Sequence, residues 1–211
     1  MIMSKEKEIK NYLNDLFLNN TIELLYTKDY ELLIAVMLSA QTTDKRVNKV
    51  TRVLFDKYKS LNDLKNASLS DVKDIVYQLG NYNKKSKAVI EIASILLDKY
   101  DGKVPNDRKS LESMPMVGRK TASVVLSTLF NVPEIAVDTH VFRVSKRLAI
   151  TSLDDDVLET EKKLQKFFLI EDWSNIHYKL VLFGRYYCLA KNPKCETCKL
   201  KKYCIENKKV D

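Results

Sequence analysis

Residues 114–122 read Met-Pro-Met-Val-Gly-Arg-Lys-Thr-Ala, and apolar residues recur at helical spacing on both sides of them. We expect a short helix over about Arg108–Ser113 and a longer one over Arg119–Phe130. Pro115 and Gly118 predict a tight turn between the two helices. Such a turn directs backbone N–H groups outward at the positive end of the second helix, where they bind a phosphate without contacting a base. The alternative is a plain corner between two helices.

The remainder of the chain also shows helical rather than strand spacing. Only four glycines and four prolines occur in 211 residues, which suits long helices with short joints. Ser68-Leu-Ser-Asp71 has the form of a capping box and predicts the start of one helix. The extended-looking piece Glu134–Val137 is too short to found a sheet, so the predicted fold class is all-α. Expected helices cover Ile9–Phe17, Leu32–Ala40, Thr43–Tyr58, Val72–Leu79, Lys84–Tyr100, Asp138–Ala149, Asp154–Phe168 and Ser174–Cys188.

Lys120 falls in the first turn of the helix that follows the predicted hairpin, directly after Arg119. A helix N-terminus and a second cation both favour the neutral form of an ammonium group. A neutral lysine amine is a nucleophile suited to Schiff-base chemistry at a sugar carbon. The alternative is a basic face that contacts DNA phosphates, and for Arg119 we prefer that interpretation.

Asp138 follows Lys120 by eighteen residues, in the sequence Val137-Asp-Thr-His140. An aspartate ahead of an apolar helical stripe is a good N-cap, and taken alone this interpretation is preferred. A carboxylate at this position also suits two chemical roles, stabilising a cationic sugar or accepting a proton from an attacking amine. His140 and His177 are interpreted as structural residues, because neither is needed to complete a metal site.

The chain contains four cysteines, all in one stretch with the pattern C-x6-C-x2-C-x5-C: Cys188, Cys195, Cys198 and Cys204. Four clustered thiols predict a thiolate metal site in a reducing compartment. By ligand count alone, tetrahedral zinc is the commoner occupant, and four unligated cysteines are the alternative. Lys191 and Lys194 lie in the same stretch, where they form either a solvated face or contacts to phosphate.

Charge indicates the class of partner. The chain has 36 lysines and arginines against 28 aspartates and glutamates, a net charge of +8. A basic balance of this size favours a polyanion as partner, although solubility alone is an alternative explanation. The longest apolar runs, such as Leu32–Ala40, are far too short to span a bilayer, so no membrane association is expected.

Five motifs together resemble one family, the endonuclease III branch of the helix–hairpin–helix DNA glycosylases. The hairpin alone is not specific, but the set occurs in the family's order and extends along essentially the whole chain. The motifs are L-S-A-Q-T-T-D at 38–44, P-x-V-G-R-K-T-A at 115–122, A-V-D-T-H-V-F-R-V at 136–144, G-R-Y-x-C at 184–188 and the cysteine pattern at 188–204.

The resemblance implies a two-lobed helical fold. A six-helix barrel at residues 22–132 would contain the hairpin at about 108–130, and residues 1–21 with 133–211 would form the second lobe. The active cleft would lie between the lobes. The resemblance further implies that the four cysteines hold a [4Fe–4S] cluster in the loop 188–204, with a structural and DNA-positioning role. It also implies a monomer, cytoplasmic and nucleoid-associated if the source is bacterial or archaeal.

The resemblance assigns an activity as well, that of a bifunctional DNA glycosylase and AP lyase acting in base excision repair on oxidised pyrimidines and abasic sites in duplex DNA. Lys120 would attack C1′ of the damaged nucleotide and carry the sugar as an imine, and β-elimination would nick the strand on the 3′ side. Asp138 would activate Lys120 or stabilise the sugar cation, and Gln41 would fill the space left by the extruded nucleotide. The alternatives are a monofunctional mismatch glycosylase, against which Lys120 argues, and a non-catalytic helical DNA-binding protein with a metal cluster.

Two positions depart from the family pattern. Met116 stands where the hairpin L-P-G-V-G usually has its first glycine, and a left-handed backbone there would cost about 1 kcal/mol. Asn81 stands where a large apolar wedge usually faces the opposite strand, so opposite-base insertion is expected to differ. Together with the residues of the hairpin and the cysteine stretch, these positions complete the predicted DNA contacts, which are Gln41, Asn81, Met116, Gly118, Arg119, Lys191 and Lys194.

Overall fold

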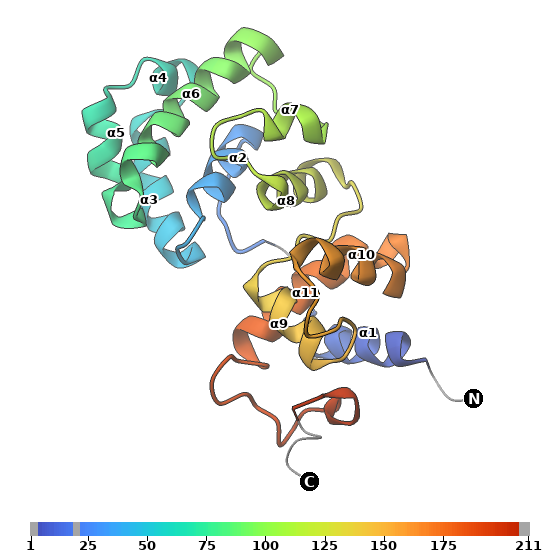
Figure 1. The fold of residues 1–211 in the computed structure, drawn as a ribbon. Coiled ribbons are helices and arrows are strands. Elements are labelled where there is room, and N and C mark those ends of the chain that lie inside the picture. Colours follow the sequence, from blue (N-terminus) through green and yellow to red (C-terminus); the bar gives the residue numbers. More distant parts are fainter. Residues whose placement is uncertain (1–3, 19–21, 207–211) are drawn as a thin grey trace. The chain divides into compact units, whose positions relative to one another are not determined.

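The structure, a computed structural model, describes residues 4–18 and 22–206 (Figure 1). Within these residues all regular structure is helical and no strand occurs, which confirms the predicted all-α class. The chain divides into two compact units. Residues 22–130 form one, called here the hairpin unit. Residues 1–21 and 131–211 form the other, called the cysteine unit because it contains all four cysteines.

The hairpin unit is built around α2 (Asp29–Leu38), whose residues Tyr30–Leu38 are all buried. A helix that is apolar on every side has to be enclosed by other helices, and α2 packs against α3, α6 and α8. The remaining helices of this unit are α3 (Asp44–Lys57), α4 (Leu61–Lys65), α5 (Leu69–Val76), the 3₁₀ turn η1 (Tyr77–Leu79), α6 (Tyr82–Tyr100), α7 (Arg108–Glu112) and α8 (Arg119–Phe130).

The cysteine unit joins the two ends of the chain. Its first helix, α1 (Lys5–Leu16), buries Ile9 and Leu13 in a core shared with α9 (Thr139–Arg147), α10 (Val157–Phe167) and α11 (Trp173–Tyr186). Two 3₁₀ turns, η2 (Ile170–Asp172) and η3 (Lys201–Tyr203), complete the unit. Because α1 packs against α11, the N-terminal helix belongs to the same core as the last long helix.

The predicted capping box at Ser68–Asp71 is wrong. Ser68 is the N-cap of α5, but its side chain makes no capping bond and instead shares a hydrogen bond with the Ser70 hydroxyl. The Asp71 carboxylate accepts a hydrogen bond of 2.8 Å from Lys57 Nζ, which lowers the pKa of Asp71 below its usual value. A long-range cation therefore outcompetes the local cap. A true capping box forms eight residues earlier, between Ser60 and Asp63.

In residues 4–18 and 22–206, no helix combines the length and apolar character needed to cross a bilayer.

Candidate active site

The hairpin predicted from residues 114–122 lies between α7 and α8. Asp107 caps α7 by accepting the backbone N–H of Ser110 at 2.9 Å, and the Val117 N–H donates to the Met114 carbonyl at 3.2 Å across the turn. Met114 and Val117 are buried, whereas Gly118 is exposed. The apolar side chains therefore anchor the hairpin to the core, and the glycine at the start of α8 faces outward.

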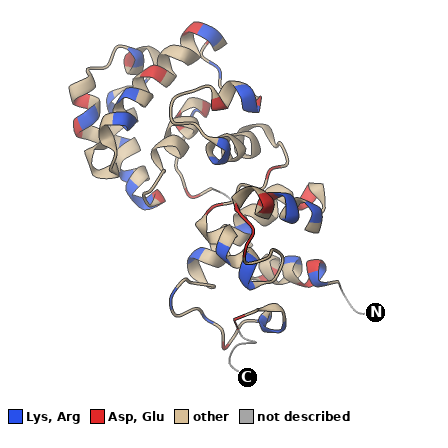
Figure 2. Ribbon diagram, viewed as in Figure 1, with Lys and Arg blue, Asp and Glu red and all other residues tan. Residues whose placement is uncertain are grey.

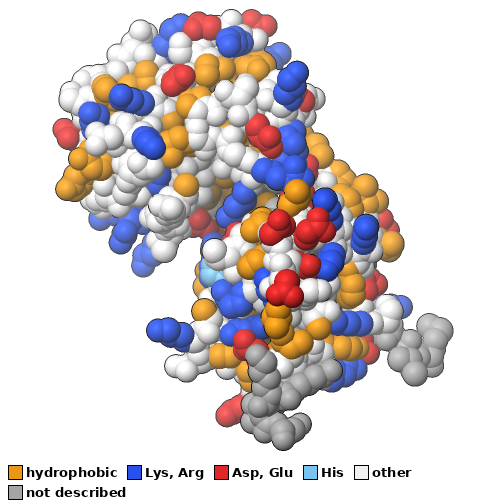
Figure 3. Space-filling view, in the orientation of Figure 1, with side chains coloured by type: hydrophobic (Ala, Val, Ile, Leu, Met, Phe, Trp, Pro, Cys, Tyr) orange, Lys and Arg blue, Asp and Glu red, His pale blue; other side chains and the backbone are white. Residues whose placement is uncertain are grey.

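Arg108 fixes α7 against α8. Its guanidinium donates to the Arg119 carbonyl at 3.3 Å and to the Ser123 hydroxyl at 3.0 Å. Both acceptors belong to the first turns of α8, so this side chain links α7 directly to the start of α8. Figure 3 shows several basic side chains over α7 and α8.

Met116 has a φ of +61°, in the left-handed region that L-residues with a side chain rarely adopt. Position 116 therefore requires the left-handed backbone that the glycine usual in the family adopts easily. At Gly118, by contrast, an added Cβ would meet no atom within 4 Å. The space above Gly118 is open, as close approach of a phosphate to the helix N-terminus requires.

Lys120 and Arg119 lie in the first turn of α8, and both side chains are exposed. A lysine at a helix N-terminus gains nothing from the helix dipole, which disfavours a cation there. The position is therefore costly for a purely structural lysine but accessible to a macromolecular substrate.

Asp138 is the N-cap of α9 in the cysteine unit. Its Oδ1 accepts the backbone N–H groups of His140 and Val141, both at 2.8 Å. The capping interpretation is confirmed, and the bonds hold the carboxylate in one orientation at the start of the helix. Lys120 and Asp138 belong to different units of the chain.

His140 lies where α11 packs against the start of α9. An added Cβ on Gly184 would lie 2.8 Å from His140 Cβ, so a glycine at position 184 allows α11 to pack directly on the start of α9. Arg143 strengthens this contact by donating to the carbonyl oxygens of Gly184 at 2.6 Å and Cys188 at 3.1 Å. The first turn of α9, including its cap, is thereby fixed on α11.

The four cysteines line one hollow at the end of α11. Its volume is about 390 Å³, including space open to solvent. Burial raises the pKa of the Cys188 thiol, an effect that the guanidinium of Arg147 opposes. Among residues 4–18 and 22–206, no three or more His, Cys, Asp or Glu side chains are placed to hold one metal ion. The hollow is lined by Arg147, Leu148, Phe183, Tyr187, Cys188, Pro193, Lys194, Cys195, Cys198, Lys201 and Cys204.

Arg147 is the main residue here that the sequence analysis missed. It is 8% exposed and donates to Cys188 Sγ at 3.5 Å, to the Leu189 carbonyl at 2.6 Å and to the Ala190 carbonyl at 3.3 Å. The signal was present, because position 147 falls beside Val144 and Leu148 on the buried side of α9. A charge on an apolar stripe indicates a specific buried partner.

The remaining predicted contacts lie in loops. Gln41 follows α2 with φ +61°, and Asn81 precedes α6 with φ +48°; both side chains are exposed. Lys191 and Lys194 are exposed in the cysteine loop, and Lys194 Nζ lies 5.9 Å from the centre of the Tyr187 ring. Gln41, Asn81 and the hairpin residues belong to the hairpin unit, whereas the two lysines belong to the cysteine unit.

Comparison with known proteins gives consistent matches. Residues 34–168 match the family described as "HhH-GPD superfamily base excision DNA repair protein". The chain is 45% identical to endonuclease III of Bacillus subtilis, over 94% of this chain and 91% of that protein. Among solved structures, a non-covalent endonuclease III–DNA complex and a trapped endonuclease III–DNA covalent intermediate in an estranged-adenine complex each match with a TM-score of 0.92 and 44% identity, over 99% of both chains.

Because Met116 has a left-handed backbone, the Met116→Gly variant should be more stable than the wild type. We expect a gain of about 1 kcal/mol in the free energy of unfolding, because glycine adopts this region without steric cost. Denaturant titration measures the change. The matched control is Lys109→Gly, in exposed right-handed helix of α7, which should lose about 1 kcal/mol. Loss of stability in both variants would show that the Met116 side chain contributes more than its backbone costs.

Proposed function

We propose that this chain uses Lys120 as its nucleophile and Asp138 as the carboxylate that assists it. The chain belongs to the HhH-GPD superfamily of base excision DNA repair proteins, and within it to the endonuclease III family. The family indicated by the five sequence motifs is confirmed, and the protein is a DNA glycosylase and AP lyase. One observation carries the proposal for Lys120, namely its exposed position at the first turn of α8, directly beyond the hairpin.

The reaction begins when the Lys120 amine attacks C1′ of the damaged nucleotide. The bond from C1′ to the base breaks, and the base leaves with a proton. The sugar ring then opens, leaving an imine between C1′ and Nζ. Loss of a proton from C2′ expels the phosphate at C3′, which nicks the strand on the 3′ side. Trapping of a related protein as a covalent intermediate with DNA supports a covalent route of this kind.

Asp138 would act at the first step, taking a proton from the attacking amine or stabilising positive charge on the sugar. Its two bonds from the α9 backbone hold one carboxylate oxygen in a fixed direction. A group that is already oriented by its own helix loses little freedom when the substrate binds. Capping and catalysis are therefore compatible roles for this residue.

The substrate in this proposal is double-stranded DNA that contains an oxidised pyrimidine or an abasic site. Chemistry at C1′ requires the nucleotide to leave the base stack. Gln41 and Asn81, on exposed loops of the hairpin unit, would occupy the duplex, and Met116, Gly118 and Arg119 would hold a phosphate. Lys191 and Lys194 would contact the DNA backbone from the cysteine loop.

The four cysteines would hold a [4Fe–4S] cluster. The proposal is supported by the family and by the four cysteines that line one hollow, since four thiolates are the usual ligands of such a cluster. The Arg147 guanidinium beside Cys188 Sγ suits an anionic ligand. Such a cluster supplies cross-links that order the loop carrying Lys191 and Lys194. Ligand count alone favours zinc, and membership of the endonuclease III family is what favours the cluster.

Replacing Lys120 by alanine should abolish strand cleavage while duplex binding changes by a few-fold at most, because one cation among many phosphate contacts is lost. The measurement is borohydride trapping on a duplex with one abasic site. A covalent adduct is expected from the wild type and from Arg119→Ala, the matched loss of a neighbouring charge. An adduct of undiminished yield from Lys120→Ala would remove Lys120 as the nucleophile.

Asp138→Asn separates the charge from the cap. Asparagine still offers an oxygen to the His140 and Val141 N–H groups and is an equally good N-cap, so stability should change by less than about 0.5 kcal/mol. Loss of the carboxylate should slow imine formation by about 100-fold or more. Single-turnover trapping and denaturant unfolding measure the two effects. A rate equal to that of the wild type would leave Asp138 with a capping role alone.

Cys198→Ala, which leaves no ligand atom at this position, should remove the visible absorption and the bound iron that the cluster predicts for the wild-type protein. Glu196→Ala, an exposed change in the same loop, should retain both. Absorption spectra and metal analysis give the answer without any enzyme assay. A colourless wild type with one bound zinc would overturn the cluster, and an unchanged spectrum in Cys198→Ala would remove Cys198 from the ligands.

A further inference from the structure

Lys85 has the most unusual environment of any lysine described in the hairpin unit. It lies in the first turn of α6 and is 1% exposed, among the largest fully buried side chains of the chain. Its Nζ donates to the carbonyl oxygen of Ala40 at 2.8 Å and to that of Leu79 at 2.9 Å. One ammonium group therefore binds two loops that are 39 residues apart in the chain.

The two carbonyl groups have a common feature, because each directly precedes a strained turn. Ala40 is followed by Gln41 at φ +61°, and Leu79 is followed by Gly80 at φ +67° and Asn81 at φ +48°. Left-handed backbone at residues other than glycine costs free energy, and it persists only where the surroundings hold it. Lys85 supplies such a restraint to both turns at once.

Packing alone does not account for a lysine at this position. Burial lowers the pKa of Lys85, which means that the folded protein disfavours the charged form. The positive end of α6 adds to this cost. A methionine would fill similar volume without a buried charge, and Lys85 lies on the same stripe of α6 as Val89, Ile92 and Leu96. What lysine adds is its hydrogen bonds to the two loops.

We propose that Lys85 is a positioning residue for lesion recognition, joining the Gln41 loop to the Asn81 loop so that both side chains enter the duplex as one preformed wedge. This inference rests on the proposed function, in which Gln41 and Asn81 occupy the DNA when the nucleotide leaves the stack. Lys85 itself touches no DNA in this account. Its contribution is the fixed spacing and backbone geometry of the two loops.

The short Asn81 side chain makes this spacing more important. A large apolar residue holds base pairs apart by its bulk, whereas asparagine has little bulk and reaches less far. A small wedge needs an accurately placed backbone, since a misplacement of about 1 Å can cost on the order of 100-fold in a positioned reaction. The restraint at Lys85 provides that accuracy.

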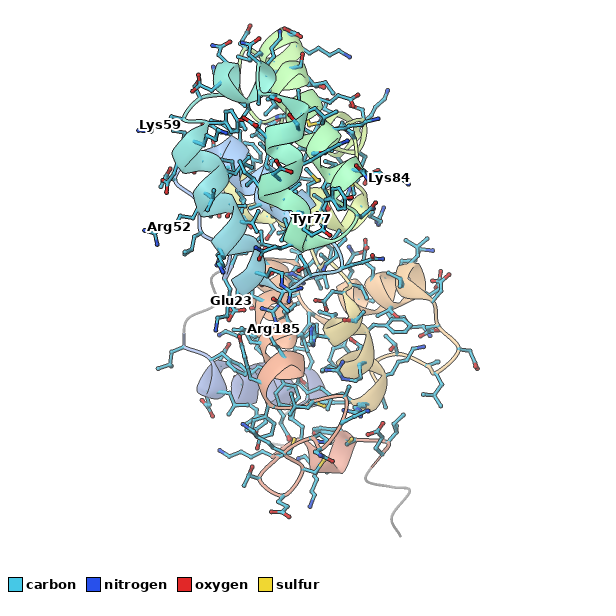
Figure 4. All side chains as sticks on the ribbon, turned by 90° about the vertical axis from the view of Figure 1, so that its left-hand side faces the viewer. Glu23, Arg52, Lys59, Tyr77, Lys84 and Arg185 are labelled. Atoms are coloured by element: carbon cyan, nitrogen blue, oxygen red, sulfur yellow. The ribbon has the colours of Figure 1, made fainter. Side chains whose placement is uncertain are left out.

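The test compares Lys85→Met with Lys84→Met. Lys84 is exposed in the same turn of α6 and points away from the unit in Figure 4, so its replacement removes an equal charge without affecting either loop. Fluorescence anisotropy gives the affinity of each protein for a duplex with one tetrahydrofuran site, an uncleavable abasic analogue, and for the intact duplex of the same sequence. The selectivity is the ratio of the two affinities.

The selectivity of Lys85→Met should be about tenfold lower than that of the wild type, because only the damaged duplex requires the wedge. Lys84→Met should weaken binding to both duplexes alike and keep the ratio, since its effect is electrostatic. Selectivity in Lys85→Met equal to that of the wild type would overturn the proposal. So would an equal loss of affinity for both duplexes, which would assign Lys85 to stability alone.

The uncleavable analogue also separates this inference from the proposed chemistry. Binding selectivity does not require Lys120 to react, so a wild type that selects the tetrahydrofuran duplex but forms no borohydride adduct would refute the nucleophile and leave the wedge in place. Conversely, a wild type that forms the adduct but shows no selectivity would refute the wedge and leave the nucleophile in place.

Discussion

The complete burial of α2 is the constraint on which the hairpin unit depends. Residues Tyr30–Leu38 have no solvent-facing side, so the neighbouring helices α3, α6 and α8 are required to enclose them. Enclosure brings the end of α2, and with it Gln41, close to the start of α6. Lys120 lies at the start of α8, which is another of the helices that enclose α2. Within the hairpin unit, Gln41 and Lys120 thus lie at helix ends whose positions follow from one apolar core.

Basic side chains are spread over both units of the chain. Figure 2 shows Lys and Arg on helices of both units rather than on one face of one helix. Three lysines or arginines are buried among the described residues, namely Lys85, Arg147 and Lys179. Lys179 donates to the Asn14 side chain, whereas Lys85 and Arg147 donate to backbone carbonyl oxygens in loops. In each unit a buried cation is used in the same way, to fix loops that helical packing alone leaves undetermined.

Much of this arrangement was predictable from sequence, for identifiable reasons. Helical spacing predicted the long helices because their apolar residues recur on the side that faces a core, but it missed the five-residue α4, which is too short to show such spacing. The Asp138 cap was predictable because its donors lie two and three residues away. The Ser68 box failed because Lys57, fourteen residues from Asp71, is invisible to a local pattern. Lys85 and Arg147 were missed because lysine and arginine are usually exposed. Their positions on apolar stripes carried the only signal.

Left-handed turns built from residues other than glycine have a thermodynamic consequence beyond their strain. Gln41, Asn81 and Met116 restrict the unfolded chain more than glycine would. The loops that contain them therefore lose less conformational entropy when the protein folds. The same restriction limits the alternative shapes open to the folded loop. These turns are therefore already ordered in the folded protein, so their ordering reduces the affinity for DNA only slightly.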